Sequence, residues 1–190
     1  MNLSSASNQG LANLIAAGLP GNPFKCAPLS IDPSAATDSE SLLRAFVEVF
    51  RSEWAKQSCN GVFIWTVATP YLHTDGKQMD SHIVYIEKTD HSFAYRWPAR
   101  YLRNLVTDDG SDGKASASPA PRELARRDYN WSFYKSMVRN HGPLQVWFAS
   151  VDELNAAFGD SAPCARDWEL AMNRQYRTYH GCLPLKNRRA

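Results

Sequence analysis

The sequence is poor in cysteine and has no long hydrophobic run. Its four cysteines, Cys26, Cys59, Cys164 and Cys182, are too far apart to form a CxxC metal or redox pair. Four cysteines in 190 residues also do not suit a scaffold built on disulfides, which favours a reducing cytoplasm. No segment approaches the roughly 20 apolar residues that span a bilayer, and residues 1–10 lack the basic head of a secretory signal. The sequence therefore predicts a cytoplasmic protein without a membrane span.

Several common catalytic motifs are also missing. The chain contains no GxxxxGK[ST] phosphate-binding loop, no GxSxG nucleophile turn and no HExxH zinc motif. Standard ATPase, hydrolase and zinc-protease chemistry therefore has no support in the sequence. A search for internal repeats and heptads is equally negative.

What the sequence does have is the composition of one folded domain. A hydrophobic fraction of 44% and an aromatic fraction of 12% are sufficient to form a core in a chain of this length. The net charge is only +2, but residues 121–190 carry 11 Lys and Arg against 7 Asp and Glu. Such a basic excess attracts nucleic acid or other polyanions, although it is also common on an ordinary solvated surface.

The first half of the chain predicts an arm, a helix and three strands. Residues 1–36 have little periodicity and predict a partly ordered N-terminal arm. A capping box at Thr37 begins an amphipathic helix that extends to about residue 57. Residues 61–69 are apolar on both faces, which indicates a central covered strand. Residues 82–88 and 92–97 then predict a hairpin that turns at 89–91.

The second half predicts mainly helices. A short helix follows Pro98, and residues 107–120 form a flexible loop because they contain no large apolar side chain. A helix over 121–140 ends at Gly142. A strand over 144–149, a helix that is capped at Ser150 and ends at Gly159, and a helix over 165–180 complete the order. Residues 37–182 are thus predicted to form a single α+β domain, with a small mixed sheet of about four to five strands and flanking helices, followed by a basic exposed tail at 183–190.

Two groups of basic residues are candidates for binding nucleotide or DNA. On the predicted helix over 121–140 several arginines lie one or two turns apart, and their planar donors pair well with phosphate oxygens. In the second group, arginines alternate with aromatic residues that offer a stacking surface. The alternatives are a solvated helix face and arginines that extend from an aromatic core. The candidates are Arg126, Arg127, Asn130 and Lys135 in the first group, and Arg96, Arg100 and Arg103 in the second.

Acidic and histidine residues supply further candidates. Glu87 on a predicted strand beside Asp90 is a carboxylate pair suited to Mg²⁺ in phosphoryl chemistry, and Asp128 lies among the arginines. Glu87 and Asp128 are the candidate catalytic residues. A separate set of possible metal ligands brackets a polar loop, but its spacing matches no familiar signature, and a loop with an Asp-Gly turn explains it equally well. This set comprises His73, Asp75, Asp80 and His82.

The order of elements over residues 121–160 resembles the second half of the ParB/sulfiredoxin superfamily, and more narrowly the Osa-type plasmid fertility-inhibition factors. The resemblance rests on a helix, a glycine stop, the strand "PLQVWF" at 143–148 and a helix that closes in "AFG" at 157–159. Where that superfamily carries a Gly-x-His-Arg turn for phosphate, this chain has "RDYN" at 127–130. In this comparison Arg126, Arg127 and Asn130 take the place of the phosphate donors.

The resemblance implies a ParB/sulfiredoxin-like fold in a bacterial cytoplasmic protein of a conjugative plasmid. It further implies that the protein blocks the transfer of other DNA by binding DNA or nucleotide, with DNase and ATPase activity that uses Mg²⁺ and ATP. A secretion-system coupling protein is a second expected partner. The alternative is a non-enzymatic interaction module that inhibits a secretion or defence protein.

Overall fold

The computed structural model describes residues 3–18, 20–26, 60–90, 133 and 136–187. Within these residues the protein is an α+β structure in which helices flank a four-stranded sheet. The elements, in chain order, are α1 (Ser5–Ala17), β1 (Lys25–Cys26), β2 (Gly61–Leu72), β3 (Asp80–Thr89), β4 (Leu144–Ser150), α6 (Val151–Phe158) and α7 (Ala165–His180). None of the helices described is both long and apolar enough to cross a membrane.

The sheet has the strand order β1-β4-β2-β3, and each of these neighbouring pairs is antiparallel. The predicted α+β class is confirmed, but the expectation of a mixed sheet is wrong for the strands described. Hydrophobic alternation in a sequence marks a strand but carries no information on its direction. Direction is decided by the connections, and here β2 and β3 follow one another through a short turn, which requires them to be antiparallel.

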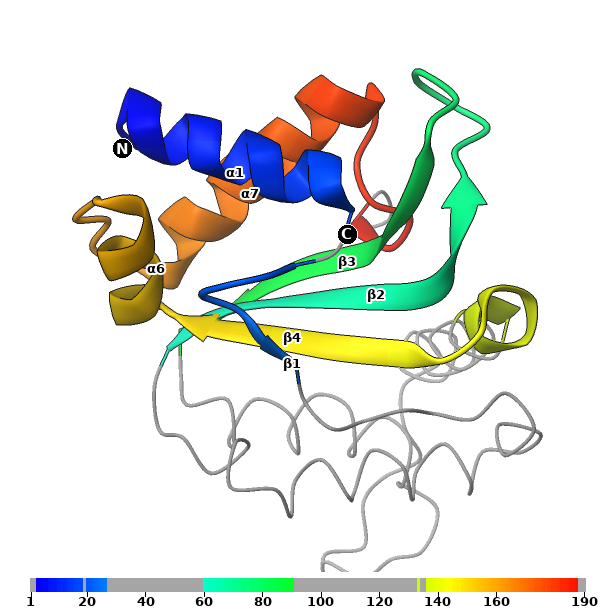
Figure 1. The fold of residues 1–190 in the computed structure, drawn as a ribbon, viewed down its shortest axis with the longest axis horizontal. Coiled ribbons are helices and arrows are strands. Elements are labelled where there is room, and N and C mark those ends of the chain that lie inside the picture. The colour runs from blue at the N-terminus through cyan, green and yellow to red at the C-terminus, as the bar shows by residue number, and fades with distance from the viewer. Residues whose placement is uncertain (1–2, 19, 27–59, 91–132, 134–135, 188–190) are drawn as a thin grey trace, which may run out of the picture.

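The predicted central strand is confirmed as β2, which lies between β4 and β3. Its residues from Gly61 to Val67 are buried, on both faces of the sheet. Val62 and Ile64 belong to the core beneath the helices, together with Leu11 of α1 and Trp168 of α7. Figure 1 shows α1 and α7 side by side over this face. The apolar run of residues 61–65 is therefore explained by burial on both faces of the sheet.

Two helices begin and end where the sequence predicted. At the start of α6, Ser150 and Glu153 form the complete capping box, and Gly159 ends the helix in the left-handed conformation at φ 64°. The last helix, α7, covers the predicted 165–180 and ends at Gly181 in the same conformation. Gly142 also has a positive φ of 81° and ends the helical turn over 136–141. These local signals are strong because few other residues adopt this backbone conformation without strain.

The N-terminal segment is more ordered than the sequence predicted. Instead of a weakly structured arm, residues 5–17 form the helix α1, capped by the Ser4 side chain, and they bury Leu11 and Ile15 completely. Polar and small residues make the helical pattern of this segment weak. The apolar side chains that it does have find a binding surface on α7, and tertiary packing supplies the stability that local propensity lacks.

β2 and β3 form a hairpin around the predicted polar loop. β3 spans 80–89 and pairs with β2, so the reversal takes place at residues 73–79, where Gly76 has φ 71°. Residues 91–97, the other predicted arm, lie outside the described residues. Also outside them are the predicted helices over 37–57 and after Pro98, the predicted loop over 107–120, and most of the predicted helix over 121–140.

The C-terminal segment is not the exposed basic tail that the sequence predicted, as far as residue 187. Lys186 is only 9% exposed, and its backbone N–H donates to the Val84 carbonyl of β3 at 3.0 Å. Asn187 binds β3 through its side chain. A basic composition predicts exposure, but β3 offers backbone N–H and C=O groups to which residues 186 and 187 bind.

Candidate functional site

Most of the residues that the sequence nominated for phosphate or DNA contact lie outside the described residues. This holds for Asp128, for Arg126, Arg127, Asn130 and Lys135 of the predicted helix, and for Arg96, Arg100 and Arg103 of the second basic group. The candidate catalytic residue Glu87 lies within the described residues.

Glu87 lies on β3, opposite Phe63 of β2, and it is only 4% exposed. Its side chain belongs to the face of the sheet that also carries Phe63 and Tyr85, whose rings meet edge to face at 6.3 Å. This face is opposite α1 and α7, because neighbouring residues of a strand point to opposite sides. The negative charge of Glu87 also raises the pKa of Glu169 on α7, after the larger effect of burial on that carboxyl.

The four possible metal ligands around the hairpin do not form a metal site in the structure. His73 is fully buried, with its Nε2 2.6 Å from the Tyr176 hydroxyl. His82 instead directs its Nδ1 to the Val67 carbonyl at 2.9 Å. No cluster of three or more His, Cys, Asp or Glu able to hold a metal ion occurs in the described part of the chain. The polar loop with an Asp-Gly turn is the arrangement that the structure has.

At the β2–β3 turn the structure has a buried polar cluster instead of a metal site. Its centre is the hydroxyl of Tyr176 on α7, a side chain that is 0% exposed. That hydroxyl donates to Ser81 Oγ at 2.7 Å and lies 2.6 Å from His73 Nε2 and 3.1 Å from the Tyr71 hydroxyl. Tyr71 in turn donates to the Ile83 carbonyl at 2.5 Å. Helix α7 and both strands of the hairpin thus meet in one hydrogen-bonded group.

His180 completes the cluster on the side of the α7 C-terminus. Its ring lies 4.2 Å from that of Tyr176 at an interplanar angle of 30°, and 5.2 Å from that of His73. The imidazole is 2% exposed, and among the residues that the structure describes neither ring nitrogen has a hydrogen-bond partner. Burial lowers the pKa of His180 below its ordinary value, and the nearby Lys77 ammonium lowers it further. His180 is therefore held in the neutral state.

The backbone of the same helix end is tied to the hairpin. Lys77 N–H donates to the His180 carbonyl at 2.8 Å, and Lys77 Nζ reaches the Thr178 carbonyl at 2.8 Å. These bonds satisfy carbonyls that the last turn of a helix leaves without partners. They also bring Gly76 so close to His180 that a Cβ there would lie 2.4 Å from the His180 carbonyl oxygen.

The chemistry of this cluster follows from its burial. Since the one Tyr176 O–H proton goes to Ser81 Oγ, the 2.6 Å contact needs His73 Nε2–H as the donor to the phenol oxygen. Burial, with Tyr71 beside it, also raises the pKa of the Tyr176 phenol far above its ordinary value, so the phenol remains protonated. With Tyr176 and His73 both 0% exposed, the arrangement holds α7 on the hairpin and fixes the orientation of its members. In this structure it is a packed polar centre rather than an open reaction site.

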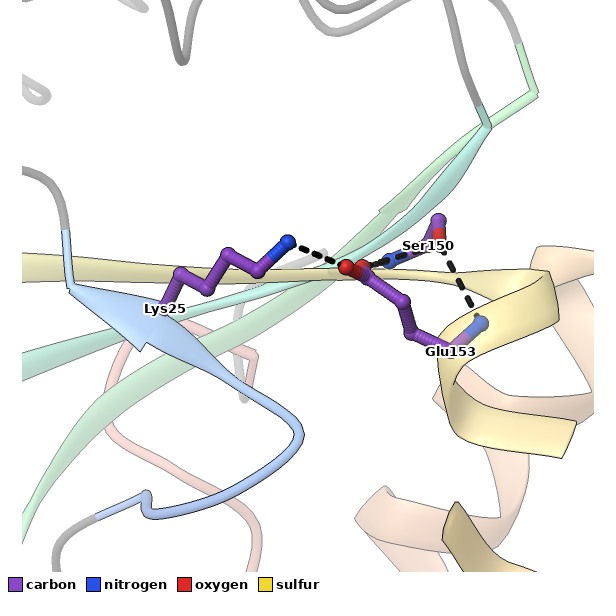
Figure 2. A network of polar contacts seen from close by, with 3 residues as sticks. All are labelled: Lys25, Ser150 and Glu153. Carbon is purple, nitrogen blue, oxygen red and sulfur yellow. Dashed lines mark hydrogen bonds and ion pairs between the residues drawn. The ribbon is translucent and has the colours of Figure 1, made fainter. Parts of the chain in front are cut away.

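A second polar network lies at the junction where β4 leads into α6. Figure 2 shows the Glu153 carboxylate between Ser150, whose backbone N–H donates to it at 2.9 Å, and the Lys25 ammonium of β1. Partial burial alone would raise the pKa of Glu153, but the hydrogen bonds from Lys25 and Ser150 hold it below its ordinary value. The capping box of α6 thereby also fastens the short strand β1.

Sequence reasoning missed the buried cluster although it identified several of its members. In the predicted helix over 165–180, Trp168, Met172 and Tyr176 follow one another at spacings of four residues, which predicts one apolar face, and all three are fully buried. This spacing predicts that the three side chains are buried, but not which polar groups the Tyr176 hydroxyl contacts. That the Tyr176 hydroxyl would meet His73 and Ser81, about a hundred residues away, depends on the docking of α7 on the hairpin, which no local pattern contains.

Comparison with known proteins adds no relative. No protein-family model, no curated protein and no solved structure matches this chain.

Proposed function

We propose that this protein is a plasmid-encoded fertility-inhibition factor that blocks the transfer of other DNA, and that it acts by binding DNA or nucleotide in the bacterial cytoplasm. The proposal includes a ParB/sulfiredoxin-like architecture and an Osa-type relationship. Its binding residues are the arginines of the 121–140 segment, foremost Arg126 and Arg127, with Asn130 and Lys135.

The single observation that carries the proposal is the local structure over residues 136–159. A helical turn ends at Gly142, a short strand follows, and a helix with a complete capping box closes at Gly159. This is the order that the resemblance implies for the segment after the phosphate-facing turn. Residues 126–130 precede this segment in the sequence, which is the position where the resemblance has its phosphate donors.

The charge distribution provides a second, weaker support. The basic excess lies in residues 121–190, and α7 contributes Arg166, Arg174 and Arg177 to it. Phosphate contacts supply most of the affinity of sequence-independent DNA binding, and they depend on such charges. We extend the proposal to Mg²⁺-dependent DNase and ATPase activity with Asp128 and Glu87 as the candidate carboxylates. We also extend it to a secretion-system coupling protein as a second partner.

The test is a binding titration with fluorescently labelled DNA at two salt concentrations. We compare the wild-type chain with Arg126→Ala/Arg127→Ala and with a matched control, Arg166→Ala/Arg177→Ala. The control removes the same charge from two exposed positions on α7. If residues 126 and 127 contact phosphate, their loss weakens binding and flattens the dependence of log K on log salt by about 0.9 for each lost contact. The control leaves most of the affinity intact.

Two results would refute the proposal. Equal losses in the two double variants would mean that DNA responds only to overall charge and not to a site at 126–127. No salt-sensitive binding by the wild-type chain would instead favour the non-enzymatic interaction module, which docks on a secretion or defence protein. Cleavage of plasmid DNA with Mg²⁺, and hydrolysis of ATP, are then measured on the same proteins to test the catalytic extension.

A further inference from the structure

The last turn of α7 contacts the turn between β2 and β3 (Figure 1). The His180 carbonyl accepts from the Lys77 N–H at 2.8 Å. The two segments meet through glycines, since a Cβ on Gly181 would lie 3.0 Å from the Gly76 Cα. We call this contact of residues 180–181 with residues 76–77 the joint. At the joint, backbone lies directly against backbone.

The joint has less apolar burial than the rest of α7. Trp168 and Met172, in the first half of the helix, belong to the hydrophobic core and are fully buried. The turn residues 74–78 are exposed, and so is the hydrogen bond from Lys77 Nζ to the Thr178 carbonyl. Segments that depend on exposed hydrogen bonds and few apolar contacts open at a lower cost in free energy than the core. Local opening of α7 is therefore favoured at this end.

The His180 ring belongs to the joint and is surrounded by other rings. It stacks on Tyr176 of its own helix at 4.2 Å, and it lies 4.9 Å from Tyr179 and 5.2 Å from His73 of the turn. Within the described ranges, neither ring nitrogen has a hydrogen-bond partner. Protonation adds a second N–H to the ring, and this donor has no acceptor in the closed joint.

The charged groups around His180 do not compensate a proton on its ring. Burial lowers the pKa of His180, and the Lys77 ammonium of the turn lowers it further. The acidic residue of that turn, Asp75, is exposed and accepts from the hydroxyl of the preceding residue at 2.9 Å. Behind the helix, the Cys182 thiol donates to the His180 carbonyl at 3.8 Å. Carbonyls at a helix C-terminus attract a cation, but those of this last turn already accept from Lys77.

We propose that the joint is an acid-operated cover over the buried polar cluster of Tyr176, His73 and Ser81. Protonation of His180 places a charge where no acceptor reaches it, so the ring leaves the aromatic stack for water. The last turn of α7 then separates from the β2–β3 turn, while the half of the helix that lies in the core stays in place. Tyr176 and His73, which are 0% exposed in the closed joint, become accessible to solvent.

Amide hydrogen exchange between about pH 7 and about pH 5 measures the opening directly, because opening takes up a proton. The Lys77 amide donates across the joint, and the Ile64 amide lies in the central strand β2. We expect the protection factor of the Lys77 amide to fall by up to about tenfold for each pH unit below about pH 6.5. Adding about 1 M urea should speed exchange at Ile64 and leave Lys77 nearly unchanged, since the response to urea scales with the surface exposed.

Two histidine variants assign the proton. His180→Phe keeps a ring in the stack and removes the titrating nitrogens, so the Lys77 protection factor should be the same at both ends of the pH range. His82→Asn is the matched control, because it removes a histidine of the same hairpin and keeps a donor for the Val67 carbonyl, which His82 Nδ1 contacts at 2.9 Å. It should show the pH dependence of the wild-type chain.

Three results overturn the proposal. The first is a pH dependence that survives in His180→Phe, and the second is one that disappears in His82→Asn. The third is a Lys77 amide that follows Ile64 in its response to both pH and urea, which means that the whole sheet unfolds. Should His180→Phe lose its circular dichroism spectrum, Lys77→Met decides, because it removes the ammonium and keeps the backbone N–H. Its total fall in protection should be smaller than that of the wild-type chain, and an equal fall contradicts the proposal.

Discussion

Replacement of Tyr176 by phenylalanine is the most direct measure of the buried cluster that joins α7 to the hairpin. The change removes one oxygen and leaves the ring, which is 0% exposed, in place. Lost with it are the contacts to His73 Nε2 at 2.6 Å and to Ser81 Oγ at 2.7 Å. Ser81 Oγ still accepts from the Ile83 N–H at 3.1 Å, whereas the 2.6 Å contact to His73 Nε2 is lost outright.

The expected magnitude follows from the cost of buried polar groups. Each one that loses its partner costs about 1–3 kcal/mol. With two groups affected, one of them only in part, we expect the free energy of unfolding to fall by about 3 kcal/mol. For a chain of this length that corresponds to a melting temperature lower by about 6–12 °C.

The assay is urea denaturation followed by circular dichroism, with Tyr179→Phe as the matched control. Tyr179 belongs to the same helix and meets His180 edge to face, at 4.9 Å between ring centroids. With the described part of the chain, its hydroxyl makes no hydrogen bond comparable to those of Tyr176. The control should be within about 0.5 kcal/mol of the wild-type chain. A Tyr176→Phe protein as stable as the control would refute the view that the hydroxyl network holds α7 on the hairpin.

Two further predictions concern pH and close packing. Because the pKa of His180 is lowered in the folded state, protonation favours unfolding: stability should be complete above about pH 6.5 and should decline as the pH falls below it. His180→Phe should reduce this decline, and an unchanged pH profile would contradict the reasoning. Gly61→Ala should cost about 2 kcal/mol, since its Cβ would lie 2.2 Å from the Ala149 carbonyl oxygen. Gly21→Ala, with nothing within 4 Å of its Cβ, should leave the melting temperature nearly unchanged.

Elements with strong local signals were predictable. The capping box at Ser150 and Glu153 and the left-handed glycine at 159 mark both ends of α6, because caps and positive φ values depend on residues that are adjacent in the sequence. The continuous apolar run of β2 likewise identified a central strand. By contrast, α1 has a weak pattern of its own, and its helical state depends on contact with α7.

The candidate site was predictable only in its types of residue. Charge alone makes the arginines candidates for phosphate contact and Asp128 a candidate catalytic carboxylate. Both roles stay predictions, and the variant at 126–127 tests the first. Glu87 is a candidate by residue type, as a carboxylate beside Asp90 suited to Mg²⁺, and the structure buries it on the second face of the sheet. Whether a carboxylate on a strand faces solvent depends on what covers that face, which alternation alone does not reveal.

The sequence by itself determined where most of the described helices and strands begin and end, since turn glycines, caps and hydrophobic period act over a few residues. Only the tertiary structure decided that all described strand pairs are antiparallel, that Tyr176 meets His73, and that Asn187 binds β3. These contacts join residues about a hundred positions apart. Their geometry is set by the docking of whole elements, because the burial of apolar faces is non-directional and hydrogen bonds then select one arrangement among those that it allows.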